Sequence, residues 1–477
     1  MTRLKSKVIT GLAWSSIAKF ISQLLSWVAT FVVIRYLNPS DYATVGIVFA
    51  FTAFFYVLSE FGLADALIQK ETVTEENYSQ VFSATLALNS VIFLFITVLS
   101  TPFANFYQNE ALASVLVFTA ANLLLSSFIV VPEALMNKAM LFKKRAFIET
   151  AANTLNTITT LGLAVIGFGF WSILIGLVIN TLSRVVLLNY FGYHHYKITF
   201  NFSGFASLLN FGGYTFASRA VWALYNKLDI LIIGRVFGAQ SLGIYTVATQ
   251  LASMPLDKIS GTINQVAFSA FSQNSDNEKH FLLSLRLLSI TIFPAFIGIA
   301  AISPILVPIL IGDKWLESIV IIQLLSLIMP LKLINSFINT FIASQGDAKF
   351  NLKMSLLYLG FVTIGLLMGS YFDFVGTVIG LVISYACCFL IVSFISLTKT
   401  SCKITSFLDC LLRPILCSLS MWLFIWVFTN QLPVTIPPII NLLIMMLFGV
   451  TTYIILALVF ARTHLKDVLD LCRQVKS

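Results

Sequence analysis

The sequence predicts an all-α polytopic membrane protein with about fourteen transmembrane helices. Of its 477 residues, 58% are hydrophobic and only 10% are charged, whereas about 25% of the residues in a soluble domain are charged. The mean hydropathy of +0.93 agrees with that composition. Apolar runs of about 20 residues, enough to cross a bilayer, recur along the chain between short polar breaks. Because these runs fill the chain, no stretch is left for a soluble domain.

The fourteen helices are placed by these apolar runs, in chain order. The first run is longer than a signal-peptide core and contains Lys19, so we interpret it as an uncleaved helix. The first six helices are expected to start near Val8, Tyr42, Gln80, Ala111, Phe147 and Trp171. The next six are expected near Phe205, Ser241, Phe281, Trp315, Phe350 and Phe374, and the last two near Phe407 and Pro438.

The loops between these helices alternate in charge, which predicts the side of the membrane on which each lies. Every second loop is basic, as at residues 138–145, whereas the loops between them hold only Arg35, Arg235 and Lys314. Basic loops lie on the cytoplasmic side, so both termini are predicted to be cytoplasmic. The net charge of +9 then reflects topology. Because no basic domain stands outside the membrane, no nucleic-acid partner is expected.

The sequence lacks the residue motifs that are typical of several classes of enzyme. It has no HExxH, Walker or GxSxG motif, and its six cysteines match neither a zinc site nor a CxxC redox pair. A membrane polymerase or acyltransferase would show a long external loop or a catalytic histidine within a span, and the sequence has neither. We therefore expect a protein that is not an enzyme and has no metal or cofactor, except for a possible coupling proton or sodium ion.

An internal repeat predicts how the helices are organised. Arg35 and Arg235 lie in related segments at an offset of 200 residues, and Lys143 and Lys349 pair at an offset of 206. The pattern predicts an N-lobe at 1–200, a C-lobe at 201–400, each of six helices, and two further helices with a cytoplasmic tail at 401–477. Because each repeat has an even number of spans, the lobes share one orientation, which is typical of transporters that alternate access around a central site.

Two cations at equivalent positions of the lobes predict the site. Lys19 lies about eleven residues into the first helix, at a depth of about 16 Å, where a charge costs roughly 2.5–3.5 kcal/mol unless it meets water or a partner. Arg219 falls at the same place in the seventh helix. We therefore expect a hydrated, cationic cavity between the lobes. The polar and aromatic residues expected in the cavity are Ser15, Ser22, Ser26, Trp222 and Asn226.

Other charges within spans leave alternatives open. Lys258 and Lys332 could line the same cavity, or Lys332 could extend toward the cytoplasmic interface. The acids Glu60, Asp229 and Asp257 could bind a coupling ion or balance the cations structurally. These five residues therefore stay candidates with more than one role.

A further pair is expected to be purely local. Arg413 has Asp409 four residues before it, the spacing of an ion pair along one helix. Arg184 lies nearer the inner interface, and we assign it no site role.

Several motifs resemble those of a known family. They include Arg35-x-Leu37-x-Pro39-x-Asp41-Tyr42 and Leu58-Ser-Glu60-Phe-Gly62-Leu63-x-x-Ala66-Leu67-Ile68-Gln69, with Asp229-x-Leu-Ile-Ile-Gly234-Arg235 and Leu242-Gly243-x-Tyr245 in the second half. Together they are similar to the polysaccharide transporters, the Wzx-type flippases of the MOP exporter superfamily, over nearly the whole chain. The chain departs from that pattern at Ala43, where glycine is usual, and at Glu60, where aspartate is common.

The resemblance implies a function. Such a protein would be a multi-pass protein of the bacterial inner membrane that flips undecaprenyl-pyrophosphate-linked oligosaccharide for exopolysaccharide, O-antigen, lipopolysaccharide or capsule synthesis. Lys19 and Arg219 would attract the pyrophosphate. Expected partners are the lipid-linked oligosaccharide, membrane lipids, and a polymerase with its chain-length machinery. The alternatives are a lipid II-type peptidoglycan precursor flippase and a MATE-like multidrug or cation antiporter.

Overall fold

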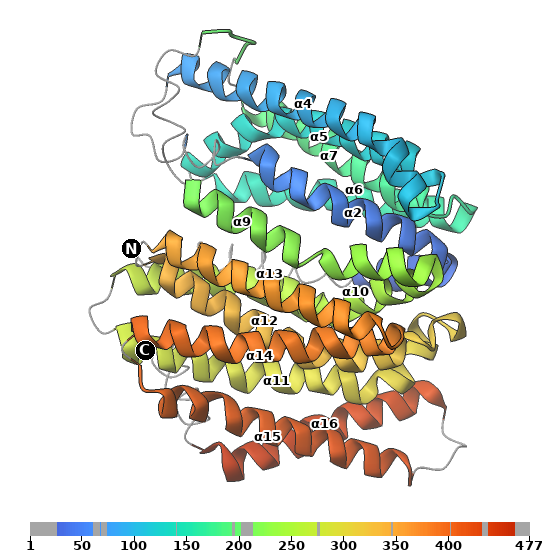
Figure 1. The fold of residues 1–477 in the computed structure, drawn as a ribbon, viewed down its shortest axis with the longest axis vertical. Coiled ribbons are helices and arrows are strands. Elements are labelled where there is room, and N and C mark those ends of the chain that lie inside the picture. Colours follow the sequence, from blue (N-terminus) through green and yellow to red (C-terminus); the bar gives the residue numbers. More distant parts are fainter. Residues whose placement is uncertain are drawn as a thin grey trace, which may run out of the picture. The chain divides into compact units, whose positions relative to one another are not determined.

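The computed structural model describes residues 26–60, 67, 74–139, 141–192, 196–201, 213–273, 277–344, 347–400, 402–431 and 437–462. In these residues every regular element is a helix (Figure 1). Eleven of the described helices are long and apolar enough to cross a membrane. The prediction of an all-α polytopic membrane protein is therefore confirmed.

The chain divides into two compact units. Unit 1 comprises Met1–Ala223 with Gly238–Gly243, and unit 2 comprises Leu224–Phe237 with Ile244–Ser477. The elements of unit 1 are a helix at Ser26–Tyr36, α2 (Pro39–Glu60), α4 (Glu75–Tyr107), α5 (Ala111–Lys138), α6 (Phe142–Ile166), α7 (Trp171–Gly192) and most of α9 (Gly213–Tyr225). Those of unit 2 are α10 (Leu228–Gln273), α11 (Asn277–Leu310), the short turn η1 (Asp313–Trp315), α12 (Ser318–Ser344), α13 (Ala348–Ser370), α14 (Phe374–Thr400), α15 (Ile404–Thr429) and α16 (Pro438–Phe460).

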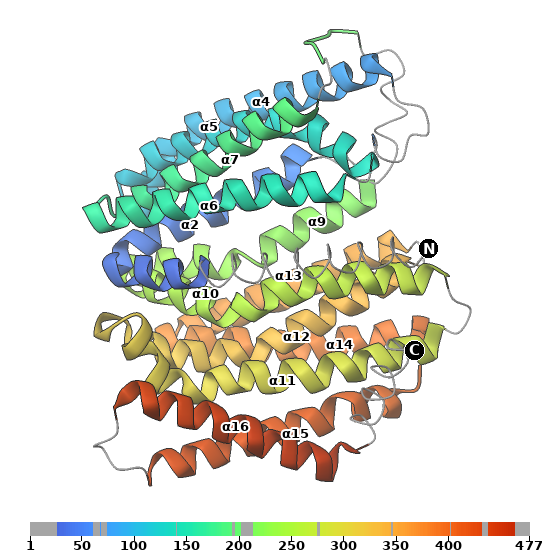
Figure 2. The same cartoon turned by 180° about the vertical axis from the view of Figure 1, so that it is seen from behind.

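The order of elements repeats between the units. In unit 1 a helix break at Leu37–Asn38 precedes α2, and in α10 a break at Gly238, with φ of 75°, lies 200 residues later. In unit 1, α4 to α7 follow, and in unit 2, α11 to α14 follow in the same order (Figure 2). α15 and α16 are the extra pair at the end, and both pack on α11, where the Tyr453 hydroxyl of α16 donates to the Ile290 carbonyl at 2.8 Å.

Glycines allow equivalent helix pairs of the two units to pack closely. In the α6/α7 pair, a Cβ at Gly176 would lie 2.0 Å from the Thr160 hydroxyl oxygen. In the α13/α14 pair, a Cβ at Gly380 would lie 2.2 Å from the Gly365 carbonyl oxygen. Small residues bring membrane helices together because van der Waals packing replaces the hydrophobic drive that lipid removes. The same device thus recurs in both halves of the repeat.

Capping and turn residues explain why α4 and α12 begin at other residues than the sequence predicts. α4 begins at Glu75 rather than near Gln80, because Thr74 forms a capping box with Asn77. Near the predicted start at Trp315 the chain instead makes the turn η1, with Trp315 fully buried, and α12 begins at Ser318. The hydrophobic runs mark the spans, whereas caps and turns set the terminal residues.

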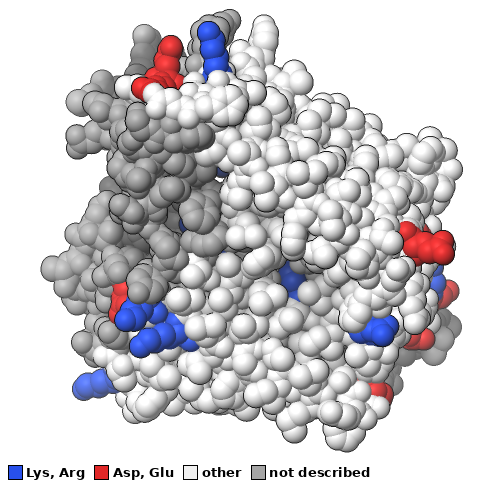
Figure 3. Space-filling model, turned by 45° about the horizontal axis from the view of Figure 1, so that its top comes forward, with Lys and Arg blue, Asp and Glu red and all other residues white. Residues whose placement is uncertain are grey.

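The face of the molecule drawn in Figure 3 is mostly uncharged where its residues are described. In the space-filling view of Figure 3, Lys, Arg, Asp and Glu form a few separate patches among uncharged residues. Large apolar side chains such as Val98 and Ile166 are 74% and 73% exposed. In a membrane helix such side chains face lipid.

Candidate functional site: charged groups within the spans

In unit 2, a lysine near the middle of α12 lies against an aromatic cluster. The Lys332 ammonium is 5.6 Å from the ring centroid of Tyr385 on α14. The Tyr385 ring contacts Tyr358 of α13, with centroids 5.0 Å apart, and Tyr358 stacks on Tyr225 at 5.5 Å and 18°. All three rings are buried, and Asn335 lies beside the Tyr385 hydroxyl. We call Lys332, Tyr225, Tyr358 and Tyr385 the lysine–tyrosine cluster.

The Tyr385 ring contacts one side of the Lys332 ammonium, and no described residue accepts a hydrogen bond from it. Among the described residues, Lys332 makes no hydrogen bond or ion pair, and its side chain is half-buried. An ammonium carries three donors, and an aromatic face attracts it without satisfying them. Lys332 is therefore a cation held in position with its hydrogen-bonding capacity available to a ligand.

Asp229 of α10, an acid that acts electrostatically on Lys332, has hydrogen-bond partners of its own. It is 5% exposed, and its carboxylate accepts a hydrogen bond from the Tyr245 hydroxyl at 2.6 Å and from the Ile230 amide at 2.8 Å. Asp229 and Lys227 both act electrostatically on Lys332, in opposite directions. Asp229 thus offsets part of the charge without forming a direct ion pair.

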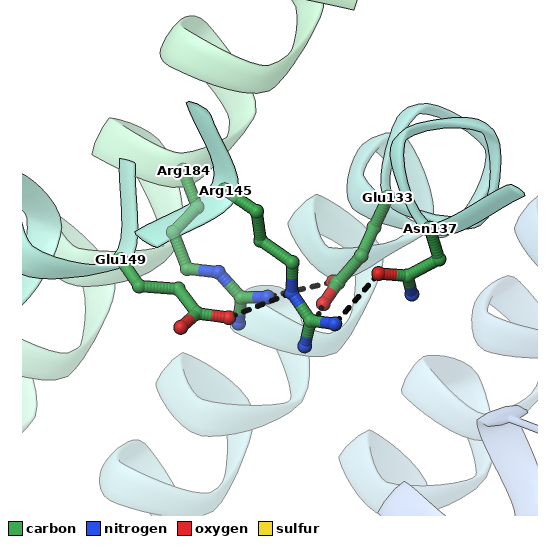
Figure 4. A network of polar contacts seen from close by, with 5 residues as sticks. All are labelled: Glu133, Asn137, Arg145, Glu149 and Arg184. Atoms are coloured by element: carbon green, nitrogen blue, oxygen red, sulfur yellow. Dashed lines mark hydrogen bonds and ion pairs between the residues drawn. The ribbon is translucent and has the colours of Figure 1, made fainter. Parts of the chain in front are cut away.

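In unit 1 a group of charged residues on α5, α6 and α7 forms a network whose charges cancel (Figure 4). Glu133 of α5 binds Arg145 of α6 at 3.0 Å and Arg184 of α7 at 2.7 Å, one carboxylate oxygen to each. Arg145 also binds Glu149 at 2.8 Å and donates to the Asn137 side-chain oxygen at 2.6 Å. These five residues, which we call the arginine–glutamate network, contain two acids and two bases. The network joins three helices and has no net charge, so it is suited to holding helices together rather than to binding a charged ligand.

Two residues of the Arg35–Tyr42 motif, Pro39 and Asp41, make contacts at the ends of helices. Asp41, in the first turn of α2, accepts hydrogen bonds from the Asn38 amide at 2.9 Å and, across the chain, from the Phe170 amide at 3.3 Å. Gly243 packs so closely on Pro39 that a Cβ there would lie 1.8 Å from the Pro39 carbonyl oxygen. The motif therefore positions helix ends.

The structure describes only part of the predicted site. Ser15, Lys19 and Ser22 lie outside the described residues, as do the side chains of Glu60, Asp257 and Lys258. On α9, Arg219 and Trp222 are both exposed. They are three residues apart and therefore lie on one helix face. Asn226, just after the end of α9, is half-buried. Ser26 is half-buried, and its carbonyl accepts a bond from the Thr30 hydroxyl at 2.9 Å. Predictions for these residues therefore remain predictions.

One local prediction is confirmed, and two clusters were missed. Arg413 and Asp409 form an ion pair at 2.6 Å. Tyr358 and Tyr385 carry no sequence signal, because an aromatic in an apolar run looks like any lipid-facing or core residue. The arginine–glutamate network joins three helices. Of its contacts, only the Arg145–Glu149 pair could be predicted from the sequence, because the two residues are four apart on one helix.

Known proteins similar to the chain are named for the biosynthesis of polysaccharides. It is 28% identical to the lipopolysaccharide biosynthesis protein WzxC of Escherichia coli (strain K12), over 76% of each chain. It is 24% identical to the succinoglycan biosynthesis transport protein ExoT of Rhizobium meliloti (strain 1021), over 99% of this chain and 97% of the relative.

Solved structures that are similar to the chain identify its fold. The lipid II flippase MurJ in an inward closed conformation matches with a TM-score of 0.77 at 20% identity, covering 94% of this chain and 99% of that one. An inward-facing MATE multidrug transporter of the MOP superfamily matches with a TM-score of 0.62 at 16% identity, covering 80% and 94%. The family model described as polysaccharide biosynthesis protein matches residues 32–320. The chain is therefore a multi-pass membrane protein that belongs to the polysaccharide biosynthesis protein family, with the fold of the MOP superfamily transporters.

Proposed function

We propose that the protein is a flippase that moves undecaprenyl-pyrophosphate-linked oligosaccharide across the bacterial inner membrane for exopolysaccharide, O-antigen or capsule synthesis. Relatives named for succinoglycan transport and lipopolysaccharide biosynthesis support the substrate class. The lobes 1–200 and 201–400 would alternate access to a cationic cavity, with both termini in the cytoplasm. A polymerase and chain-length machinery would take up the delivered repeat units.

Lys332 is the observation that carries the proposal. It lies near the middle of a span, keeps its donors unused among the described residues, and is held from one side by the face of Tyr385. A charge at that depth is costly and is typically functional. A pyrophosphate brings negative charge and strong acceptor oxygens, which form charge-assisted hydrogen bonds with an ammonium.

Arg219 would supply a second contact from α9. Its guanidinium is exposed on the helix face that also carries Trp222, which is 53% exposed. A guanidinium matches phosphate oxygens with a two-pronged geometry, and an exposed indole offers a flat surface for a sugar ring. Lys19 and Lys258, with Ser15, Ser22 and Ser26, would complete the cavity, and a proton or sodium ion bound at Glu60, Asp229 or Asp257 could drive the cycle.

The excess of cations argues against a cation exporter. A site for cationic drugs would need acids without partners, yet Asp229 already accepts two hydrogen bonds. A lipid II-type flippase remains the second candidate, favoured by the fold match to MurJ. Both substrates carry a pyrophosphate, so the cationic site alone does not separate them.

Genetic complementation tests the proposal. A deletion strain would receive the wild type, Lys19→Ala, Arg219→Ala, Lys332→Gln or Lys332→Arg, with membrane levels compared by blot and surface polysaccharide measured. We expect Lys332→Gln and the two alanine variants to lose polysaccharide while Lys332→Arg keeps it. A wild type that restores no polysaccharide would overturn the substrate class, and neutral variants that complement fully would overturn the site.

A further inference from the structure

The first two turns of α6 have two distinct faces. The inner face holds Ile148, 1% exposed, with Arg145 and Glu149 bound into the arginine–glutamate network. The opposite face presents Lys143 and Lys144, both exposed, and Phe147, which is 60% exposed. Residues three and four apart are neighbours on a helix surface, so Phe147 lies beside both lysines.

No acid of the neighbouring helices balances the two lysines. Glu133 and Glu149 are the only acidic residues in α5, α6 and α7. Both are bound to Arg145 and Arg184 within the network. Within these three helices, no carboxylate is therefore left to balance Lys143 and Lys144.

An apolar stripe continues from the lysines along the same face of α6. Leu155, Ile158 and Val165 are 46%, 62% and 51% exposed, and they recur at helical spacing below Phe147. At 1.5 Å per residue, Leu155 lies about 16 Å along the helix from Lys144. That distance is about half of a hydrocarbon core of about 30 Å, or one leaflet.

We propose that this outer face of α6 binds one anionic phospholipid of the surrounding membrane. The lipid phosphate would accept hydrogen bonds from Lys143 and Lys144, Phe147 would lie at the level of the headgroup, and an acyl chain would follow the stripe. Basic clusters beside a span attract anionic lipids in this way. The site shares no residue with the proposed transport cavity, so the inference does not depend on the cargo.

The repeat supplies a matched control in unit 2. Lys349 and Lys353 are both exposed in the first two turns of α13, and Lys353 stands where α6 has Phe147. There, however, an acid sits beside the lysines, because Asp347 caps α13 by accepting a bond from the Phe350 amide at 3.1 Å. The two surfaces carry equal numbers of lysines, but among the described residues only the one on α6 has an exposed aromatic, and only the one on α13 has an acid at its helix cap.

Lipid titration of the delipidated full-length protein tests the proposal. Native mass spectrometry would measure binding of phosphatidylglycerol and phosphatidylcholine to the wild type, Lys143→Gln/Lys144→Gln, Phe147→Ser and Lys349→Gln/Lys353→Gln. Glycerol phosphate would be added as a soluble competitor, and thermal unfolding would check folding. We expect phosphatidylglycerol to bind more tightly than phosphatidylcholine. Affinity should fall about tenfold in the α6 double variant, less in Phe147→Ser, and under about twofold in the α13 variant.

Three results would overturn the proposal. Equal losses in the α6 and α13 variants would mean that any lysine near the membrane attracts these lipids. Equal binding of phosphatidylcholine would mean that headgroup charge is not recognised, and competition by glycerol phosphate would mean that the lipid chains contribute nothing. Polysaccharide export, measured separately, reports on the proposed function, so the two can fail independently.

Discussion

The arginine–glutamate network of unit 1 and the lysine–tyrosine cluster of unit 2 differ in how their charges are paired. In unit 1, Glu133 is shared by Arg145 and Arg184, and the result is a neutral network that ties three helices together. In unit 2, among the residues that the structure describes, the face of Tyr385 is the contact that holds Lys332, and the nearby Asp229 accepts a hydrogen bond from Tyr245. A neutral set of ion pairs stabilises a fold, whereas a positioned cation with unused donors can bind an anion. We therefore propose that pairing, rather than the mere presence of charge, separates the structural residues of the network from the binding residue Lys332.

Removing the shared carboxylate of unit 1 should give the largest change in stability. Glu133→Gln leaves Arg145 and Arg184 without their common partner, and a partly buried pair of cations then repels. Their side chains are 36% and 29% exposed, so solvent screening reduces the loss, and we expect about 1–3 kcal/mol in the free energy of unfolding.

The matched control is the more exposed Arg413–Asp409 pair, with side chains 43% and 34% exposed. Asp409→Asn should cost under about 1 kcal/mol. Thermal unfolding in detergent measures both variants. Equal shifts would mean that sharing Glu133 between two arginines adds nothing to stability.

Loss of the Tyr245 hydroxyl should weaken unit 2 by a smaller amount. Tyr245→Phe removes the 2.6 Å hydrogen bond to the buried Asp229 carboxylate. One hydrogen bond to a charged group contributes about 1.5–3 kcal/mol, and we expect a loss near the lower value because the Ile230 amide still donates. An unchanged midpoint of thermal unfolding would argue that Asp229 is already satisfied without Tyr245.

We expect the aromatic ring of Tyr385, rather than its hydroxyl, to contribute to substrate binding. Tyr385→Phe keeps the aromatic face beneath Lys332, whereas Tyr385→Leu removes it. A cation–π contact contributes about 0.5–2 kcal/mol, so the leucine variant should bind the lipid-linked substrate about two- to thirtyfold more weakly, and the phenylalanine variant should bind it normally. Substrate affinity and thermal stability, measured together, distinguish positioning from folding. Equal affinity in both variants would remove Tyr385 from the site.

Much of the fold could be predicted from the sequence, but less of the site. Hydrophobic length alone indicates the spans, and the offset between Arg35 and Arg235 matches the equivalent breaks at Leu37–Asn38 and Gly238. Lys332 could be singled out because a charge within an apolar run is conspicuous. Tyr385 could not, because its role arises only when α12 and α14 pack together.

Transport by Lys332 variants tests the central claim most directly. Purified wild type, Lys332→Gln and Lys332→Arg would be placed in liposomes at equal density, and flipping of a fluorescent undecaprenyl-pyrophosphate-linked oligosaccharide would be followed. If an available cation at this position binds the pyrophosphate, Lys332→Gln should slow flipping about tenfold or more, and Lys332→Arg should keep most of the activity. A Lys332→Gln protein that flips the lipid at the wild-type rate would contradict that account.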